Sequence, residues 1–473
     1  MVFSSTVFLL YFLPLFLILY HSVSEKFKNL IILLGSIFFY SWGAPSFVFV
    51  ILFSTYIDFH IVKKLYRSEN LSQRKLFLSA SILLNLGLLG YFKYANFFVE
   101  NLNLALHNLG IQPFAWIEVA LPIGISFYTF QTLTYSIDVY RNTEQPLDKV
   151  SNYMLYIMSF PQMIAGPIVR FSSIAKQLKN RKESFDDKLS GFYRFCIGLS
   201  KKVLIANVLA QEADLIFDSN LNTLSMSQAW IGMTAYTFQI YFDFSGYSDM
   251  AIGLGKILGF KFPENFNSPY VAQSISEFWR RWHITLGDFM RDYLYIPLGG
   301  NRVSNRWRLF FNLWIVFLLS GLWHGSEWNF VIWGGYHGLF LIFDRIFLVH
   351  LLTRLGSIFS TCFTFIIVMF SWIIFRLESL NDIKVYFSKL FSLNIEFVFS
   401  NKIEFWSILL IAIAFSFSAK TKLGKHAQSY FFNQKKYSLK EHLFLSSICV
   451  LLFAVCLSSI TSSEFNPFIY FRF

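Results

Sequence analysis

The chain has 473 residues, of which 55% are hydrophobic and 20% aromatic, and its mean hydropathy is +0.49. This composition excludes an ordinary soluble protein, which would leave too much apolar surface in contact with water. The charge-free run from Leu443 to Ser463 is long enough to cross a hydrocarbon core of about 30 Å as a helix. Shorter apolar runs lie at Val7–Tyr20, Leu30–Trp42, Phe47–Ile57, Leu76–Tyr91, Ala229–Tyr241, Phe310–Trp323, Ser357–Phe375 and Phe405–Phe417. We therefore expect an all-α, polytopic integral membrane protein with roughly ten to thirteen transmembrane or re-entrant helices.

The formal net charge of +12 is concentrated in a few segments. Basic residues cluster in Lys63–Lys75, Arg170–Lys202, Arg280–Arg308 and Lys420–Lys440. The positive-inside rule places such loops in the cytoplasm, and both termini then fall on the outer, periplasmic side. Membrane orientation explains the charge, so we expect no nucleic-acid partner. No Lys or Arg precedes the first apolar run and no small-residue cleavage site follows it, so this run is expected to stay as a membrane helix.

The organisation of the chain predicts one integral membrane domain over residues 1–473, because no linker or internal repeat divides it. Its middle, residues 121–338, mixes apolar stretches with Gly, Pro, Asp, Arg and His, and we expect this part to build a cavity that the two ends of the chain surround. Three local predictions follow from the sequence. The segment FPQMIAGPIVRF should be kinked or re-entrant, Phe262–Tyr270 should be a loop, and Ser274–Met290 should be an amphipathic helix capped by Ser274 and Glu277.

His283 lies in that last segment, within FWRRWHITL. Trp279 lies four positions before it, so a continuous helix would place both side chains on one face. Arg280 and Arg281 can snorkel to the interface, and tryptophans are common in the aromatic belt, so an interfacial helix is one interpretation. Neither lipid anchoring nor charge balance needs an imidazole, however. We therefore predict that His283 belongs to a reaction centre, with Trp279, Arg280 and Arg281 as supporting or substrate-binding residues.

His324 lies between Gly321 and Gly325 in LLSGLWHGSEWNF. Glycines allow close approach of a neighbouring helix or a ligand. An imidazole titrates near ~6.5, and burial favours its neutral, basic form. We predict that His324 is a general base beside an apolar wall formed by Trp323, although a hydrogen-bonded structural histidine is the alternative. For His337, thirteen residues further on, that structural interpretation is favoured.

Asp243 and Asp249 are acidic residues in an apolar segment, YFDFSGYSDM, and such residues are functional candidates by default. They could bind substrate or a proton, or form structural ion pairs with arginines such as Arg280. No HExxH, Walker A or GxSxG motif occurs, and the four isolated cysteines predict neither a metal site nor a disulfide framework. No bound cofactor is therefore expected.

The terminal sequence EFNPFIYFRF allows two interpretations. An aromatic tail just outside a final span is typical of an interfacial anchor that contacts membrane lipid. Tyr470, three residues from the chain end, could also be a mobile nucleophile.

These motifs, in this order, resemble the membrane-bound O-acyltransferase (MBOAT) family, in its bacterial branch for alginate and peptidoglycan O-acetylation. The resemblance is carried by LPIGISFYTFQTLTYSIDVYR, FPQMIAGPIVRF, YFDFSGYSDMAIGLG, FPENFNSPY, FWRRWHITLGDFMRDYLYIPLGGNR and LWHG, and it covers most of the chain. It implies a multi-pass protein of the bacterial inner membrane that takes an acyl group from acetyl-CoA, another acyl-CoA or an acyl carrier protein. It further implies that His324 is catalytic, that His283 is the polar residue of the preceding motif, and that Tyr470 is an acyl carrier.

The resemblance also implies delivery of the acyl group through a central funnel or tunnel to the outer side. A periplasmic partner of the SGNH type would then complete transfer to a polysaccharide acceptor. Alginate, peptidoglycan and other envelope glycans all remain open as that acceptor. The competing class is a polytopic transporter or flippase of a lipid-linked saccharide, which shares the buried charges and polar middle. A structural scaffold is a third, weaker interpretation, because it gives no reason for two histidines in a glycine-broken centre.

Overall fold

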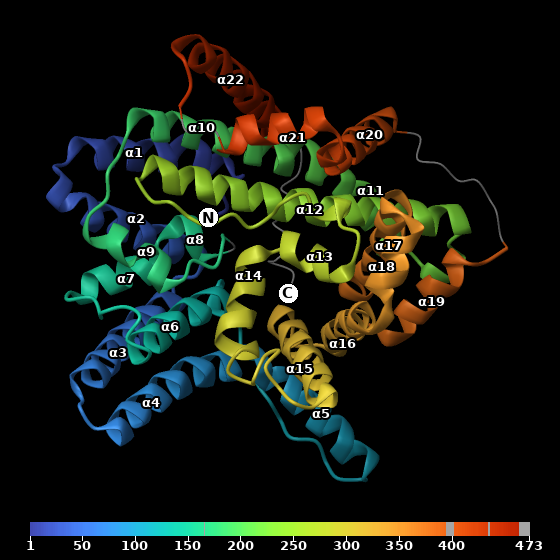
Figure 1. Ribbon diagram of the computed structural model, residues 1–473, viewed down its shortest axis with the longest axis horizontal. Coiled ribbons are helices and arrows are strands. Elements are labelled where there is room, and N and C mark those ends of the chain that lie inside the picture. Colours follow the sequence, from blue (N-terminus) through green and yellow to red (C-terminus); the bar gives the residue numbers. More distant parts are fainter. Residues whose placement is uncertain (165, 394–401, 434–435, 463–473) are drawn as a thin grey trace. The chain divides into compact units, whose positions relative to one another are not determined.

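The computed structural model describes residues 1–164, 166–393, 402–433 and 436–462, and within these ranges the regular elements are helices, with no β-strand (Figure 1). The prediction of an all-α fold is confirmed. A helix satisfies its backbone donors and acceptors within one segment, which is the condition for crossing a hydrocarbon layer. By its internal contacts the chain divides into two compact units. Unit 1 comprises Met1–Lys182 with Gly259–Phe262, and unit 2 comprises Glu183–Leu258 with Pro263–Phe473. The single membrane domain with a polar middle stays a prediction.

Unit 1 is built from packed helices, with α3 on α4, α4 on α6 and α2 on α7. Its helices are α1 (Leu13–Ser22), α2 (Glu25–Gly43), α3 (Phe47–Arg67), α4 (Leu71–Leu89), α5 (Ala95–Asn108), α6 (Ile125–Tyr140), α7 (Val150–Met158), α8 (Phe160–Met163) and α9 (Phe171–Lys179), with π-helical turns at Val7–Phe12 and Gly90–Tyr94. The short α8 and the non-helical chain before α9 confirm that FPQMIAGPIVRF is broken, as its two prolines require.

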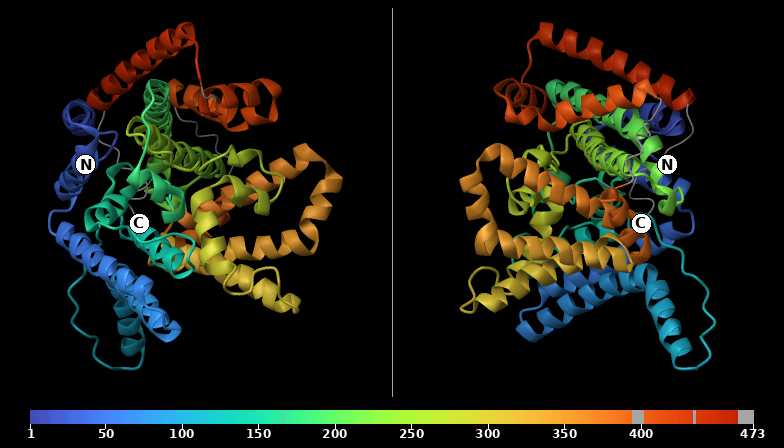
Figure 2. Two further views of the ribbon diagram at one scale, coloured as in Figure 1. Left: turned by 60° about the vertical axis from the view of Figure 1, so that its left-hand side comes forward. Right: turned by 90° about the vertical axis from the view of Figure 1, so that its right-hand side faces the viewer.

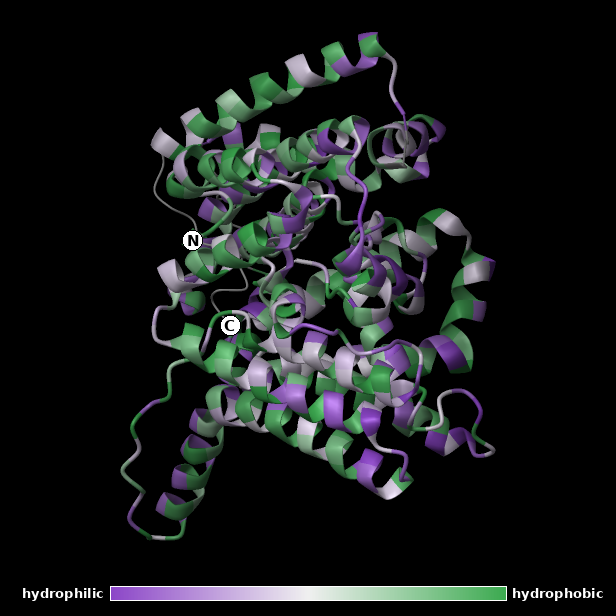
Figure 3. Cartoon of the chain, turned by 90° about the vertical axis from the view of Figure 1, so that its left-hand side faces the viewer, coloured by the Kyte–Doolittle hydropathy of each residue, from purple (hydrophilic) through white to green (hydrophobic). Residues whose placement is uncertain are grey.

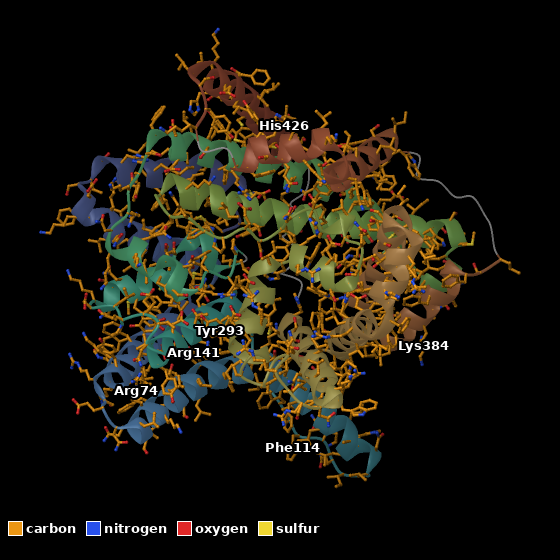
Figure 4. The ribbon with its side chains drawn as sticks, viewed as in Figure 1. Arg74, Phe114, Arg141, Tyr293, Lys384 and His426 are labelled. Carbon is orange, nitrogen blue, oxygen red and sulfur yellow. The ribbon has the colours of Figure 1, made fainter. Side chains whose placement is uncertain are left out.

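Polar contacts tie the helices of unit 1 together. The buried carboxylate of Asp58 in α3 accepts hydrogen bonds from Ser81 and Asn85 of α4 and from Tyr153 of α7. Arg74, marked in Figure 4, donates from α4 to the carbonyl oxygen of Tyr140 at the end of α6, at 2.8 Å. A buried polar group is costly unless it is hydrogen-bonded, so these contacts fix how the helices pack.

Unit 2 is organised around the long helix α12, which packs along α10 and α11, while α15 packs along α16 (Figures 1 and 2). Its helices are α10 (Phe185–Ser200), α11 (Asn207–Phe217), α12 (Met226–Ile257), α13 (Ile275–Arg281), α14 (Ile284–Phe289), α15 (Arg306–His324), α16 (Trp328–Phe343), α17 (Val349–Leu355), α18 (Ser357–Arg376), α19 (Leu380–Leu390), α20 (Ile403–Phe417), α21 (Lys422–Gln428) and α22 (Leu439–Ser462). Its π-helical turns are Lys201–Ala206, Met290–Tyr295, Asp344–Leu348 and Ser429–Asn433, and its 3-10 turns are Leu221–Thr223, Pro269–Val271 and Ser418–Lys420.

Facing glycines let α10 and α12 touch along their backbones. A Cβ on Gly198 would lie 2.5 Å from the carbonyl oxygen of Gly246, and a Cβ on Gly191 would lie 2.6 Å from that of Gly253. Small residues at helix interfaces permit such close approach in membrane proteins. The contact holds the polar residues of both helices at a fixed separation.

Four helical stretches in the described ranges are long and apolar enough to cross a membrane: Leu71–Asn108, Ser357–Arg376, Ile403–Lys420 and Leu439–Ser462. Hydrophobic residues run along α22, the helix at the top of Figure 3. The protein is therefore a multi-pass membrane protein. The total of ten to thirteen spans and the side on which the termini lie stay predictions.

Candidate functional site

The helix predicted over Ser274–Met290 is wrong, because the chain breaks at His283. The first helix, α13, ends at Arg281, and His283 takes the left-handed conformation, with φ 45° and ψ 53°, before α14 begins. A left-handed residue cannot continue a right-handed helix, and it is uncommon for a non-glycine residue. The Ser274 cap is confirmed, since the Ser274 hydroxyl accepts from the backbone N–H of Glu277 at 3.1 Å. The Glu277 carboxylate accepts from the backbone N–H of Gln273 instead of that of Ser274.

Hydrogen bonds from the segment Phe262–Tyr270 hold this break in place; the segment is a loop as predicted up to Ser268, and its last two residues begin the 3-10 turn Pro269–Val271. The backbone N–H of Ile284 donates to the carbonyl oxygen of Asn265 at 2.9 Å, and that of Asn267 donates to the carbonyl oxygen of Arg281, also at 2.9 Å. These contacts replace helical hydrogen bonds that the break removes. The local periodicity of the segment contains no signal for them.

Trp279 and His283 consequently do not share a helical face. The indole Nε1–H of Trp279 donates to Nδ1 of His337 at 3.3 Å, and the two rings pack edge to face. His337 is fully buried, in agreement with the structural role favoured for it. Arg281 pairs with Glu277 at 2.9 Å, whereas the side chain of Arg280 is exposed.

The imidazole of His283 is fully buried and lies against the ring of Phe244 from α12, with ring centroids 4.7 Å apart. Its Nδ1 lies 3.0 Å from Oδ1 of Asn265. The same oxygen accepts from the hydroxyl of Thr285 at 2.8 Å, and Nδ2 of Asn265 donates to the hydroxyl of Ser248 at 3.0 Å. Sequence reasoning missed Asn265, Thr285 and Ser248. The local signal for them was Asn265, the first of two asparagines between the prolines of FPENFNSPY.

His324 is the last residue of α15 and is 4% exposed. Its ring packs edge to face on Trp323 and Trp333, at centroid distances of 5.0 and 5.1 Å, and on Phe375 at 5.5 Å. Trp323 thus forms part of an apolar wall, as predicted. The imidazole of His324 is therefore enclosed by aromatic rings from α15, α16 and α18.

Glycines fix the position of this helix end. A Cβ on Gly321 would lie 2.2 Å from the carbonyl oxygen of Phe330, and one on Gly334 would lie 2.3 Å from that of Phe317. The backbones of α15 and α16 therefore touch, which confirms the close approach expected at Gly321.

The two histidines come together in unit 2. Their ring centroids lie 6.5 Å apart, and the ring of His283 is also 6.1 Å from that of Trp323. One imidazole comes from the α13–α14 break and the other from the end of α15. A pair of buried imidazoles in an aromatic surround can bind and relay a proton with little competition from water.

Asp243 and Asp249 take part in ion pairs with basic residues of the α10 region rather than with Arg280. Asp243 lies 2.9 Å from Nζ of Lys202, with both side chains 2% exposed. Asp249 lies 2.7 Å from Arg194 and 2.6 Å from Lys201. Ion pairs are thus observed with partners other than Arg280, and a role of these carboxylates in binding substrate or a proton stays a prediction. The facing glycines of α10 and α12 allow these ion pairs.

Further site predictions concern metals, thiols and the tail. Among the described residues, no group of three or more His, Cys, Asp or Glu side chains could hold a metal ion. The four cysteines are free thiols. Tyr470 lies outside the described residues, so its role stays a prediction.

Comparison with known proteins identifies the class. Residues 139–381, just over half of the chain, match the model of the MBOAT, membrane-bound O-acyltransferase family, and this range holds both histidines. The chain belongs to that family and is a membrane-bound acyltransferase.

Among its relatives are proteins named probable alginate O-acetylase AlgI. The one from Pseudomonas aeruginosa is 45% identical over 384 residues, which cover 80% of this chain and 73% of the relative. The one from Azotobacter vinelandii is 38% identical over the full length of both chains. The peptidoglycan O-acetyltransferase of Helicobacter pylori is 36% identical over 418 residues, covering 81% of this chain and 78% of the relative. These matches place the chain in the alginate and peptidoglycan O-acetylation branch of the family.

Proposed function

We propose that this protein moves an acyl group, most simply acetyl, from a cytoplasmic thioester donor across the membrane for O-acetylation of a cell-envelope polysaccharide. The observation that carries the proposal is the pair of buried imidazoles, His283 and His324, 6.5 Å apart within the family-matched region. The names of the relatives support a polysaccharide acceptor, since they specify alginate and peptidoglycan.

In the proposed step, His324 is the general base. A hydroxyl oxygen attacks the thioester carbonyl while His324 takes the hydroxyl proton. The C–O bond forms, the C–S bond breaks, and the proton passes to the leaving thiolate. If the hydroxyl is a phenol, full transfer of its proton to imidazole before attack would be uphill by about 3.5 pKa units, or about 5 kcal/mol. Proton loss should therefore accompany attack, with His324 within about 3 Å of the hydroxyl or one water away.

The neighbouring residues have supporting roles in this proposal. His283 orients the donor or the developing oxyanion, and Trp323 keeps water from the base. Trp279 holds His337 through its indole hydrogen bond. The exposed Arg280, together with Arg281, binds the phosphate-bearing carrier of the donor. Asp243 and Asp249 hold α12 against α10 through their ion pairs.

The route to the acceptor is the remaining part of the proposal. The donor is acetyl-CoA, another acyl-CoA or an acyl carrier protein, and the acyl group travels through a funnel in the inner membrane. Tyr470, on a periplasmic C-terminus, receives it and passes it to an SGNH-type partner, which acylates the polysaccharide.

Purified protein in proteoliposomes, supplied with radiolabelled acetyl-CoA, tests the proposal. Wild type should release CoA and transfer label, whereas His324→Ala should do neither and should still insert as folded protein. His107→Ala, at an exposed position of α5, is the matched control and should retain activity. Wild-type rates in His324→Ala would refute the assignment of the base. Saccharide transport without label transfer would instead favour the transporter class.

A further inference from the structure

We propose that Asn265 is a positioning residue that fixes the neutral tautomer of His283, with the proton on Nδ1 and the lone pair on Nε2. Asn265 belongs to the loop before α13, and it is 1% exposed while His283 is fully buried. The catalytic consequence rests on the proposed acyl transfer, whereas the tautomer itself does not.

The orientation of the Asn265 amide is determined by a group that can only donate. The backbone N–H of Thr285 points to Oδ1 of Asn265 at 3.3 Å, and the Thr285 hydroxyl lies 2.8 Å from the same atom. An amide turned by 180° would place its NH₂ group against that backbone N–H. The carbonyl oxygen must therefore face Thr285, and Nδ2 faces the hydroxyl of Ser248 at 3.0 Å.

The amide orientation in turn determines the imidazole. Nδ1 of His283 lies 3.0 Å from Oδ1 of Asn265, and a carbonyl oxygen can only accept. Nδ1 must therefore carry a proton. In a neutral imidazole the other nitrogen, Nε2, then holds the lone pair.

The backbone supports the same geometry. His283 is held in a left-handed conformation, and the next residue donates its N–H to the carbonyl oxygen of Asn265 at 2.9 Å. Main chain and side chain of Asn265 thus contact the same turn. The imidazole is positioned from the loop rather than from either flanking helix.

This tautomer restricts what His283 can do in acyl transfer. In its neutral form Nε2 can accept a hydrogen bond from a hydroxyl or a thiol, but it cannot donate one to a developing oxyanion. Neutral His283 is therefore suited to orienting a proton-bearing group, either the attacking hydroxyl or the thiol released from the donor, and not the developing oxyanion. Stabilisation of an oxyanion by Nε2 would require the imidazolium.

Nitrogen-15 NMR of the imidazole-labelled full-length protein in detergent micelles tests the tautomer directly, without substrate. The signals of His283 are those that disappear in His283→Gln. Wild type should show Nδ1 protonated and Nε2 unprotonated at neutral pH. A protonated Nε2 with an unprotonated Nδ1 would overturn the proposal, whatever the enzymatic activity proves to be.

Three variants test whether Asn265 positions the imidazole of His283 or only stabilises the fold. Asn265→Ala should mix the two tautomers and lower kcat about tenfold or more, since a misplaced imidazole proton is costly in proton-transfer catalysis. Thr285→Val removes one donor to the same oxygen but keeps the Asn265–His283 bond, so its tautomer should match wild type. Asn267→Ala is the matched control, because that exposed asparagine bonds through its side chain to Gln428.

The variant Asn265→Asp tests the proposal through the pH dependence of the reaction rate. A carboxylate at this position should stabilise the imidazolium of His283 and raise its pKa, so the acidic limb of the pH–rate profile should move to higher pH. Among the described residues, the titratable ring of His324 faces His283, so the shift should be measured against Asn267→Asp. An unshifted acidic limb in Asn265→Asp, or an unchanged tautomer in Asn265→Ala, would refute the proposal.

Discussion

The imidazole rings of His283 and His324 lie 6.5 Å apart. His283 is in a left-handed turn between two helices, whereas His324 is the last residue of a helix. The position of each residue depends on contacts from another segment of the chain. His283 is held by Asn265, and His324 by the contact of α15 with α16.

The first prediction is that the two histidines act as one unit. Replacing either by alanine should lower acetyl transfer by about 10² or more, the range of general acid–base catalysis. The double variant should then be little slower than His324→Ala, because residues that act together are not additive. Rates in proteoliposomes, normalised to folded protein, check this. If the two rate reductions multiply in the double variant, the two histidines have independent roles.

The second prediction concerns the contact between α10 and α12. Gly198→Ala places a methyl group 2.5 Å from a backbone oxygen, so it should destabilise the protein by about 1–3 kcal/mol. Thermal unfolding in detergent, followed by size-exclusion chromatography, measures the loss. The control is Gly87→Ala in α4, where no heavy atom lies within 4 Å and little change is expected. Equal stability of the two variants would contradict the glycine contact.

The third prediction concerns the buried pair Lys202 and Asp243. Lys202→Met or Asp243→Leu alone leaves a buried charge without this partner, so each should cost about 3–5 kcal/mol. The double variant should recover most of that loss, since an apolar pair of similar volume packs in the same place. Thermal stability of the three variants checks the coupling. As a surface control, Asp288→Asn breaks an exposed pair with Arg291 and should change stability by less than about 1 kcal/mol.

The fourth prediction concerns the tail. Tyr470→Phe keeps an aromatic anchor and removes the hydroxyl, so acyl transfer to the acceptor should stop while membrane insertion is unchanged. Mass spectrometry of the C-terminal peptide after incubation with acetyl-CoA should show an acetyl group on wild type alone. Normal transfer by the variant would mean that the tail only anchors the chain.

Class and fold were predictable from the sequence, because they depend on composition and on local signals. Apolar run length gave an all-α membrane protein, and the Ser274 cap was visible in its own segment. Gly321, near His324, likewise signalled a close helix contact.

The broken helix at His283 was missed because the hydrogen bonds that favour the break come from Asn265 and Asn267, in a different segment. The partners of Asp243 and Asp249 were missed for the same reason, since they lie on α10 and on the turn after it.

The left-handed turn at His283 also bears on how this segment can change in length. In a continuous helix, adding or removing one residue turns everything downstream by about 100°. Here the turn separates α13 from α14, and the loop residue Asn265 orients the imidazole directly. Relatives of this chain could therefore lengthen or shorten α13 by a residue and still direct the histidine the same way. A one-residue deletion between Gly321 and His324, by contrast, would rotate His324 by about 100° relative to the glycine contact that fixes the end of α15.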